Sequence, residues 1–258
     1  MKSLVQLVIR GRLVVLVVTA LVTIMRKNFV VSRVVDSTQN TVITLTNKGG
    51  QQRVRRTTGA TKLDANGIDN MRVVRFSSPP DVEGTATLLV EHSAGDDDIW
   101  IYLPALRKVR RIVSANKRES FVGTDFSYGD VIGHKVDDWT HARLKEESID
   151  GQACHVIESV PKDGAVRDSS GYSKMVSWIR TDNFVMVKAE YWDRSGQPLK
   201  RAVFSDIQLV DRERDKWQAM HLEAVNLQTG HKTEIDLKDF RANQQVPRDY
   251  FTTRYLER

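Results

Sequence analysis

Cysteine is almost missing from this chain. Cys154 is the one cysteine in 258 residues, so the chain cannot form an internal disulfide or a Cys-x-x-Cys motif. The cysteine content does not indicate the cellular compartment, because many exported proteins carry no disulfide. His155 follows directly, but neighbours in a strand point to opposite faces, which disfavours a nucleophile–base pair. We therefore expect a small buried or half-buried thiol at Cys154.

Recognisable catalytic motifs are also missing. The sequence contains no G-x-S-x-G elbow, no H-E-x-x-H motif and no glycine loop that could cradle a phosphate. Asp125, Asp130 and His134 could form an acid–base or metal site, although aspartates more often cap turns and helices. The acidic run at residues 96–98 could bind a cation, yet a solvated turn explains it more simply. We therefore expect no catalytic residue, metal or cofactor, and keep a hydrolase using Asp125 or His134 as a third hypothesis.

No apolar run is long enough to span a bilayer. The uncharged run Leu13 to Met25 rises about 20 Å as a helix, against a bilayer core of about 30 Å. Basic residues precede it, so it predicts a signal peptide over residues 1–20, cleaved after Ala20. An uncleaved membrane anchor is the alternative, and the lack of a lipobox cysteine argues against a lipoprotein. We expect a periplasmic protein whose residues 21–258 form a single domain.

Half of the excess of positive charge lies at the amino terminus. The whole chain carries a formal charge of +6. Removing residues 1–20 takes away three cations and no acid, which leaves 36 basic against 33 acidic side chains, or +3. Such a small excess is a weak argument for nucleic acid, and we expect no nucleic-acid partner.

What the chain does contain is a long series of β-strand patterns. Thr41 to Thr46 and Gln51 to Thr58 are joined by the glycine turn at residues 47–50, with Arg53 and Arg55 expected to face solvent. The pattern repeats to the clear alternation of Lys232 to Leu237. About ten or eleven strands in hairpin order predict a mainly β (α+β) protein with one antiparallel sheet, which should curl or split into a sandwich. Apolar helices at Val22 to Val35 and Asp249 to Leu256 could cover the inner face, which favours the curl.

Aromatic and basic residues concentrate in one stretch, residues 99–130. Trp100 and Tyr102 alternate with aliphatic neighbours in a strand that Pro104 should end. A basic segment at residues 107–111 follows, and then a loop rich in glycine and aspartate at residues 121–130. This stretch therefore combines apolar, cationic and turn-forming residues more densely than the rest of the chain.

These residues carry a family resemblance. Residues 100–112 (WIYLPALRKVRRI) and 121–128 (FVGTDFSY) resemble the signature of the LolA-like outer-membrane lipoprotein-sorting proteins, in particular a larger periplasmic branch associated with membrane lipid or efflux transporters. Residues 250–256 (YFTTRYL) are similar to that family's carboxyl terminus. The resemblance implies a strongly curved antiparallel sheet, an unclosed barrel with helices over its concave face, that holds acyl chains.

Candidate cargo contacts follow from the aromatic residues and the resemblance. Core packing explains any one aromatic on its own, whereas together they could line an apolar pocket. The residues expected to contact cargo are Trp100, Tyr102, Leu103, Phe121, Phe126, Tyr128, Trp178 and Trp192.

The basic segment has three interpretations. Arg107, Lys108, Arg110 and Arg111 could protect an exposed edge strand from aggregation, contact lipid head groups or a partner, or, least well, bind nucleic acid.

The function expected first is a non-enzymatic, monomeric periplasmic carrier. It would hold the acyl chains of lipoproteins or lipids and deliver them towards the outer membrane, exchanging them with an inner-membrane transporter or an outer-membrane acceptor. The alternative is a lipid-binding accessory subunit or sensor of an inner-membrane transporter of the RND type. An uncleaved anchor would favour that alternative.

Overall fold

The computed structural model describes residues 20–258. Nearly all of the expected signal peptide, including its basic segment, lies outside the described residues. Within residues 20–258, no helix is long and apolar enough to cross a membrane.

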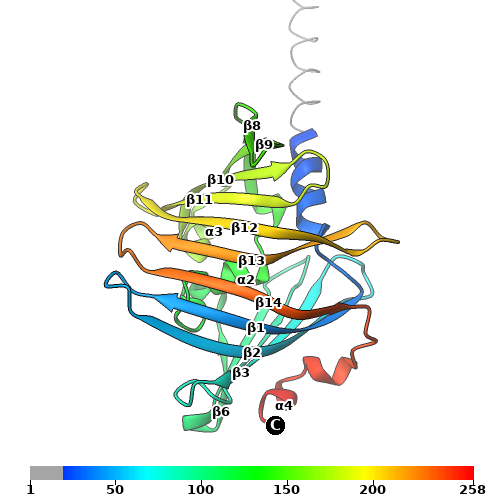
Figure 1. Cartoon of the computed structure of the whole chain (residues 1–258), viewed down its shortest axis with the longest axis vertical. Helices are drawn as coiled ribbons and strands as arrows, with labels where there is room; N and C mark the ends of the chain where they lie inside the picture. The colour runs from blue at the N-terminus through cyan, green and yellow to red at the C-terminus, as the bar shows by residue number, and fades with distance from the viewer. Residues whose placement is uncertain (1–19) are drawn as a thin grey trace, which may run out of the picture.

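One antiparallel sheet of 14 strands makes up most of the described chain (Figure 1). The strands of the first half are β1 (Asp36–Thr46), β2 (Gln52–Leu63), β3 (Asn70–Ser78), β4 (Ala86–Val90), β5 (Asp98–Leu103) and β6 (Lys108–Ile112). Those of the second half are β7 (Trp139–Arg143), β8 (Glu147–Ile149), β9 (Gln152–Pro161), β10 (Tyr172–Arg180), β11 (Met186–Asp193), β12 (Pro198–Asp211), β13 (Lys216–Asn226) and β14 (Lys232–Ala242).

The order of the strands places the start of the chain in the middle of the sheet. From β1 the chain runs by hairpins to β6 at one edge, and residues 113–138 then carry it to β7 at the other edge. From there it returns through β9 to β14, which pairs with β1, while β8 pairs only with β9. β6 and β7 do not pair, so the sheet is not closed.

The sequence underestimated the number of strands. Part of the difference lies between Trp139 and Ile149, where the pairing with β9 is interrupted and two short strands, β7 and β8, form. The basic segment also forms a strand of its own, β6, which pairs with β5 from Leu103↔Lys108 to Ile99↔Ile112. The expected glycine turns are present: in the β1–β2 hairpin, Asn47 Oδ1 accepts hydrogen bonds from the amides of Gly49 and Gln51.

The helical elements are short. The N-terminal helix spans residues 20–30 of the described chain and therefore ends before Val35, where the sequence pattern had placed its end. The others are α2 (Tyr128–Ile132), α3 (Gly164–Ser170) and α4 (Thr253–Leu256), with 3₁₀ turns η1 (Pro104–Leu106), η2 (Ser114–Asn116), η3 (Phe121–Gly123), η4 (Val136–Asp138) and η5 (Arg248–Phe251). We call residues 113–138, which include η2, η3, α2 and η4, the crossover segment.

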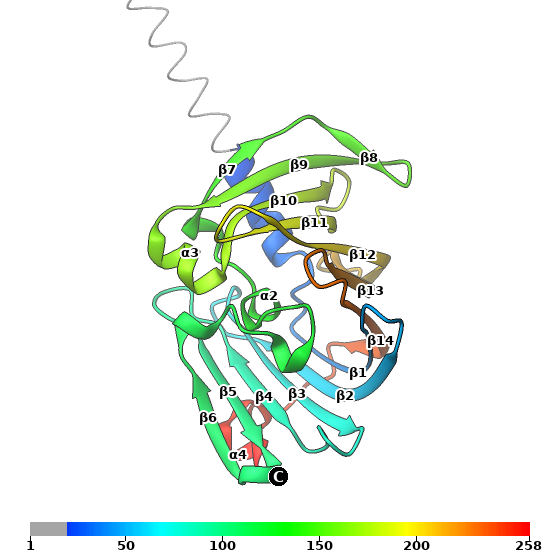
Figure 2. The ribbon, with the colours of Figure 1, turned by 90° about the vertical axis from the view of Figure 1, so that its left-hand side faces the viewer.

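The two faces of the curled sheet carry different elements (Figure 2). On the inner face, Ile43 and Phe76 pack with Phe121 and with Ile132 of α2. Leu21 of the N-terminal helix packs against Ile157 and Ile179 of β9 and β10.

The C-terminal segment lies on the opposite, outer face. Leu256 and Phe251 pack with Met71 and Val73 of β3, which alternate with the inner-face residues of that strand. The expectation that Asp249 to Leu256 would cover the inner face was therefore wrong. The alternation that brings one set of β3 side chains to the inner face gives the other set an apolar surface that this segment covers.

Candidate ligand-binding cavity

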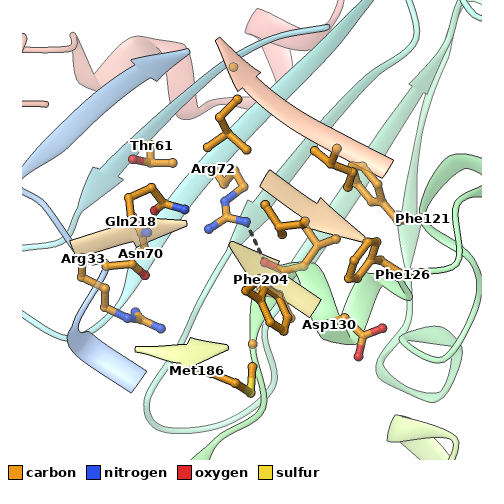
Figure 3. Close-up of a pocket in the computed structure, with 18 of the residues that line it drawn as sticks. Arg33, Thr61, Asn70, Arg72, Phe121, Phe126, Asp130, Met186, Phe204 and Gln218 are labelled. Atoms are coloured by element: carbon orange, nitrogen blue, oxygen red, sulfur yellow. Dashed lines mark hydrogen bonds between the residues drawn. The ribbon is translucent and has the colours of Figure 1, made fainter. Parts of the chain in front are cut away.

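A cavity of ≈ 390 Å³ lies between the inner face of the sheet, the N-terminal helix and α2. β1 to β3 contribute to one wall and β10 to β14 to the other, so both halves of the chain build it. Figure 3 shows residues from these strands converging on one space. Its volume lies within the range of about 300–1,000 Å³ that is usual for small-molecule sites.

One side of the cavity is apolar. In Figure 3 Phe121, Phe126 and Phe204 gather on this side, with Met186 below them. The apolar lining also includes Met25, Phe29, Ile43, Val74, Val131, Ile132, Met175, Leu222, Ile235, Leu237 and Phe240. Such a surface can bury hydrocarbon at about 0.8 kcal/mol per CH₂ group.

The other side is polar and contains buried charges. Arg33 forms an ion pair with Glu91, and these side chains are only 7% and 11% exposed. Asn70 donates its backbone amide to Glu91 Oε2 at 3.3 Å. Burial raises the pKa of Glu91, although Arg33 and Arg72 act in the opposite direction. Figure 3 shows Arg33, Asn70, Arg72, Gln218 and Thr61 together on this side.

Arginines from the sheet hold the crossover segment over the cavity. Arg72 Nη1 donates to the carbonyl of Val131 at 2.9 Å, and Arg55 donates to the carbonyl of Val122. Burial lowers the pKa of Arg72 and also that of Arg55. Arg55 was expected to face solvent but is only 7% exposed, because Val122 and Gly123 of the crossover segment cover it. Arg53, two residues away on the same face of β2, is exposed as expected.

A buried ionic cluster ties the same segment to the other half of the sheet. Asp130 lies 2.5 Å from Lys200 Nζ of β12 and accepts hydrogen bonds from Tyr172 at 2.9–3.0 Å. Burial would raise the pKa of Asp130, but Lys200 and His134 more than offset it and hold the pKa well below its usual range. Asp130 also completes a capping box with Ser127 at the start of α2, as a capping role predicts.

Asp125 and His134, the acid–base candidates, do not share one site. Asp125 Oδ2 contacts His231 Nδ1 and accepts from the Thr233 hydroxyl, both at 2.6 Å, whereas His134 contacts Asp130 at 3.3 Å. Asp125 thus links the crossover segment to β14.

The acidic run at residues 96–98 and Cys154 have contacts that suit structural roles. Asp97 is buried between Lys117 and Lys135, at 2.6 and 3.7 Å, so it is not part of a solvated turn. The described residues contain no group of His, Cys, Asp and Glu side chains that could hold a metal ion. Cys154 is buried, and burial raises the pKa of its thiol, as expected for a packing residue.

Comparisons with known proteins identify the family of this chain. Residues 69–258 match a family model described only as an uncharacterized protein. A domain assigned to the outer membrane lipoprotein-sorting proteins, from Vibrio parahaemolyticus, is similar in structure, with a TM-score of 0.84 and 30% identity, covering 93% of this chain and 100% of that one. The chain belongs to the LolA-like outer membrane lipoprotein-sorting protein family.

Two further structures resemble this LolA-like chain. A DUF1329 family protein from Desulfovibrio piger has a TM-score of 0.83 and 29% identity, with 93% of this chain and 98% of that chain covered. A LolA superfamily protein from Nitrosomonas europaea, at 22% identity and a TM-score of 0.67, covers 90% of this chain and 97% of that chain and shares the fold. No curated protein matches the sequence.

The LolA-like cavity includes only part of the predicted cargo-contact set. Phe121 and Phe126 line it, and Tyr128 is buried behind Phe121, with ring centroids 5.3 Å apart. Leu103 ends β5 outside the lining.

The four tryptophan and tyrosine predictions outside the crossover segment fall on the outer face. Trp100 and Tyr102 pack with the C-terminal segment, and Trp178 and Trp192 pack with Cys154. None of the four lines the cavity. Strand alternation revealed two faces but not which face would be inside.

The basic residues of the LolA-like signature lie at a sheet edge. Lys108, Arg110 and Arg111 are exposed on the edge strand β6, and Arg107 precedes it in a left-handed conformation, with φ of 46°. Arg111 pairs with Asp98 on β5. This placement agrees with the edge-strand interpretation and leaves these cations accessible to a membrane surface or a partner.

The polar side of the LolA-like cavity was not predicted from the sequence. Arg33, Arg72 and Glu91 come from three separate segments, and none carries a motif. One signal was available: Arg72 shares its face of β3 with Val74 and Phe76, an apolar face on which a charge is unusual.

Proposed function

We propose that this protein is a non-enzymatic periplasmic carrier that shelters acyl chains of lipids or lipoproteins and releases them towards the outer membrane. The observation that carries the proposal is the partly apolar cavity beneath the N-terminal helix and the crossover segment. A dry apolar site can bind a hydrocarbon chain through burial alone, so no bond-making step is needed. Family membership supports the same role.

Entry of cargo requires the covering elements to move. The crossover segment borders the cavity and is fixed to β2 and β3 by hydrogen bonds from Arg55 and Arg72 to its backbone carbonyls. On the same side, Phe121 packs against Phe76 of β3, and Lys117 and Lys135 pair with Asp97 between β4 and β5. Asp130 and Asp125 attach the segment to the opposite wall, at β12 and β14. We expect opening to break the contacts with β2 and β3 while Asp125 and Asp130 keep the segment attached to the opposite wall.

The test is lipid occupancy of the native protein. The full chain would be purified from an envelope fraction, its bound lipid identified by mass spectrometry, and the delipidated protein titrated with a fluorescent fatty acid. Absence of lipid together with absence of uptake would refute the carrier.

A pair of variants ties uptake to the cavity. Leu222→Trp would fill the apolar side, whereas Val203→Trp changes the neighbouring strand on its other, exposed face. We expect Leu222→Trp to weaken uptake by about tenfold or more, which corresponds to about 1.4 kcal/mol of lost binding. Val203→Trp should bind as the wild type does; equal weakening by both variants would place the ligand elsewhere.

The alternative role, an accessory subunit or sensor of an inner-membrane transporter, differs in location. Intact-mass analysis distinguishes a chain that begins at Leu21 from an uncleaved one. A soluble periplasmic chain supports the free carrier, and an uncleaved chain retained with the inner membrane supports the accessory subunit. Leu21 is buried against β9 and β10, so cleavage after Ala20 would keep this contact.

A further inference from the structure

The polar side of the cavity has an unbalanced charge. Arg33 and Arg72 face it with one carboxylate, Glu91, which gives a net charge of +1 when all three are ionised. Asp130, the other carboxylate of the lining, is already paired with Lys200. Arg33 forms an ion pair with Glu91 and also donates hydrogen bonds to the carbonyls of Phe29 and Ile68. Arg33 is therefore satisfied, and Arg72 carries the excess charge.

Arg72 has most of its hydrogen-bonding capacity free. Among residues 20–258 its guanidinium makes a single hydrogen bond, to the carbonyl of Val131. A guanidinium has five N–H groups, so four can still donate. Arg72 is half-buried in the cavity wall and forms no ion pair with the described residues, although burial lowers its pKa and Glu91 raises it. Buried charges in proteins are normally paired.

Two side-chain amides of the same cavity lining also lack partners. In the described part of the chain, Asn70 Oδ1 and Gln39 Oε1 are buried without a hydrogen bond, and neither side chain donates one. Asn70 is only 9% exposed, and both residues line the cavity. Buried polar groups are rarely left unpaired. These amides can donate to an anion through their NH₂ groups and accept from a ligand hydroxyl.

We propose that Arg72, Asn70 and Gln39 bind the anionic head of an amphiphile, a carboxylate or a phosphate ester, whose hydrocarbon lies against Phe121, Phe126 and Phe204. The inference rests on the proposed function and adds the class of cargo and its orientation, head towards Arg72. An anion there neutralises the excess charge and can receive paired N–H donors from the guanidinium. A cationic amphiphile would instead add to the positive charge.

The experiment compares heads on one chain length. Delipidated full-length protein would be titrated with dodecanoate, dodecyl phosphate, dodecanol and dodecylamine, each displacing a neutral fluorescent hydrocarbon probe. We expect the two anions to bind about tenfold or more tightly than dodecanol, since a charge-assisted hydrogen bond contributes about 1.5–3 kcal/mol. Dodecylamine should bind most weakly. Comparing the two anions separates a fatty-acid carboxylate from a phosphate head.

Variants assign the preference to Arg72. Arg72→Gln should reduce the anion-to-alcohol ratio to near one, and Arg72→Lys should keep part of it. Arg55→Gln removes the other arginine bond to the crossover segment, so it should change both affinities together and keep the ratio. Arg56→Gln, an exposed arginine on the outer face of the same strand, should change nothing.

The outcomes separate the two proposals. Equal binding of dodecanol and dodecanoate by the wild type overturns this inference but leaves a carrier, and it needs no variant to fold. A ratio that survives Arg72→Gln also overturns it. Failure of every probe and ligand to bind refutes the proposed function itself.

Discussion

At the residue scale, the buried pair of Lys200 and Asp130 is expected to contribute strongly to the stability of this protein. Lys200 and Asp130 are 4% and 5% exposed and lie 2.5 Å apart, and the rings of Phe126, Tyr172 and Tyr191 surround the ammonium group. Removing one member of such a pair leaves the other charge buried without a partner. We expect Lys200→Met to lower the free energy of unfolding by about 3–5 kcal/mol, measured by urea denaturation.

The control for Lys200 is an exposed pair on the same strand. Arg201 meets Glu190 at 3.2 Å, and Arg201 is half exposed, so Arg201→Met should change stability by at most about 1 kcal/mol. The double variant Lys200→Met with Asp130→Asn should recover part of the loss, because no unpaired charge then remains. Equal effects of Lys200→Met and Arg201→Met would contradict this account.

The same aspartate sets an acid limit on stability. The folded pKa of Asp130 is held well below the ordinary value of 3.8 by Lys200 and His134, against the effect of burial. A depressed folded pKa contributes stability that is present above the unfolded pKa and is lost as pH falls below it. We expect the wild type to lose stability below about pH 4, by up to about 1.4 kcal/mol per pH unit from this group.

Urea denaturation at a series of acidic pH values checks that loss. Asp130→Asn should be less stable at pH 7 but should show a shallower decline below pH 4, because asparagine does not titrate. A parallel decline in the two proteins would assign acid sensitivity to other groups.

Polar residues of the cavity show the limit of residue-by-residue prediction. An arginine in a strand normally faces solvent, and this expectation held for Arg53 and failed for Arg55. The neighbours of Arg72 on its face, Val74 and Phe76, are apolar, which was the available indication that this arginine points inward. Its partners lie far away in sequence, at Glu91 and Val131, and no local pattern could have supplied them.

At the scale of elements, the crossover segment is the part of the cavity cover that we expect to move when cargo enters. Its contacts with β2 and β3 through Arg55 and Arg72 are two single hydrogen bonds, whereas Asp125 and Asp130 hold it to the opposite wall through several. We expect Arg55→Gln to speed hydrogen exchange at the amides of residues 121–124 by about fivefold to thirtyfold, the effect of losing about 1–2 kcal/mol.

Hydrogen exchange followed by mass spectrometry checks this, with Arg56→Gln as the matched control on the outer face. Amides of β12 and β14 should keep wild-type rates in both variants. Faster exchange throughout the sheet would mean that Arg55 stabilises the fold as a whole rather than the closed position of this segment.

Elements with strong local signals could be predicted from the sequence, and those without such signals could not. Glycine and asparagine turns located the hairpins because positive φ and side-chain hydrogen bonds act within a few residues, as at Asn47. The alternation at Trp100 and Tyr102 was also correct, but their burial is on the outer face against α4. Which face becomes the inside depends on the direction of curl and on the C-terminal segment, and both are non-local.

At the scale of the whole molecule, the sheet has two free edges and one bridge between them. The crossover segment starts after β6 and ends at β7, so the same chain segment that borders the cavity also links the two edges. Family membership made this architecture predictable where composition did not, because a strand meander alone also allows a sandwich. The open edge β6 is where the molecule can meet a membrane, a partner or a second copy.

Two variants of β6 separate these possibilities. Lys108→Val with Arg110→Val removes exposed cations from an edge strand, and unprotected edges recruit other chains. We expect this variant to aggregate at concentrations where the wild type stays dispersed, as measured by light scattering. Lys108→Glu with Arg110→Glu keeps the edge charged and should not aggregate.

The reversed charges of Lys108→Glu with Arg110→Glu should also weaken binding to vesicles rich in anionic lipid by about tenfold or more in a flotation assay, since each cation near such a surface contributes about 1 kcal/mol. Unchanged vesicle binding would restrict these cations to protecting the edge. A dispersed valine variant would show that the edge needs no such protection, because the short length of β6, five residues, would then suffice.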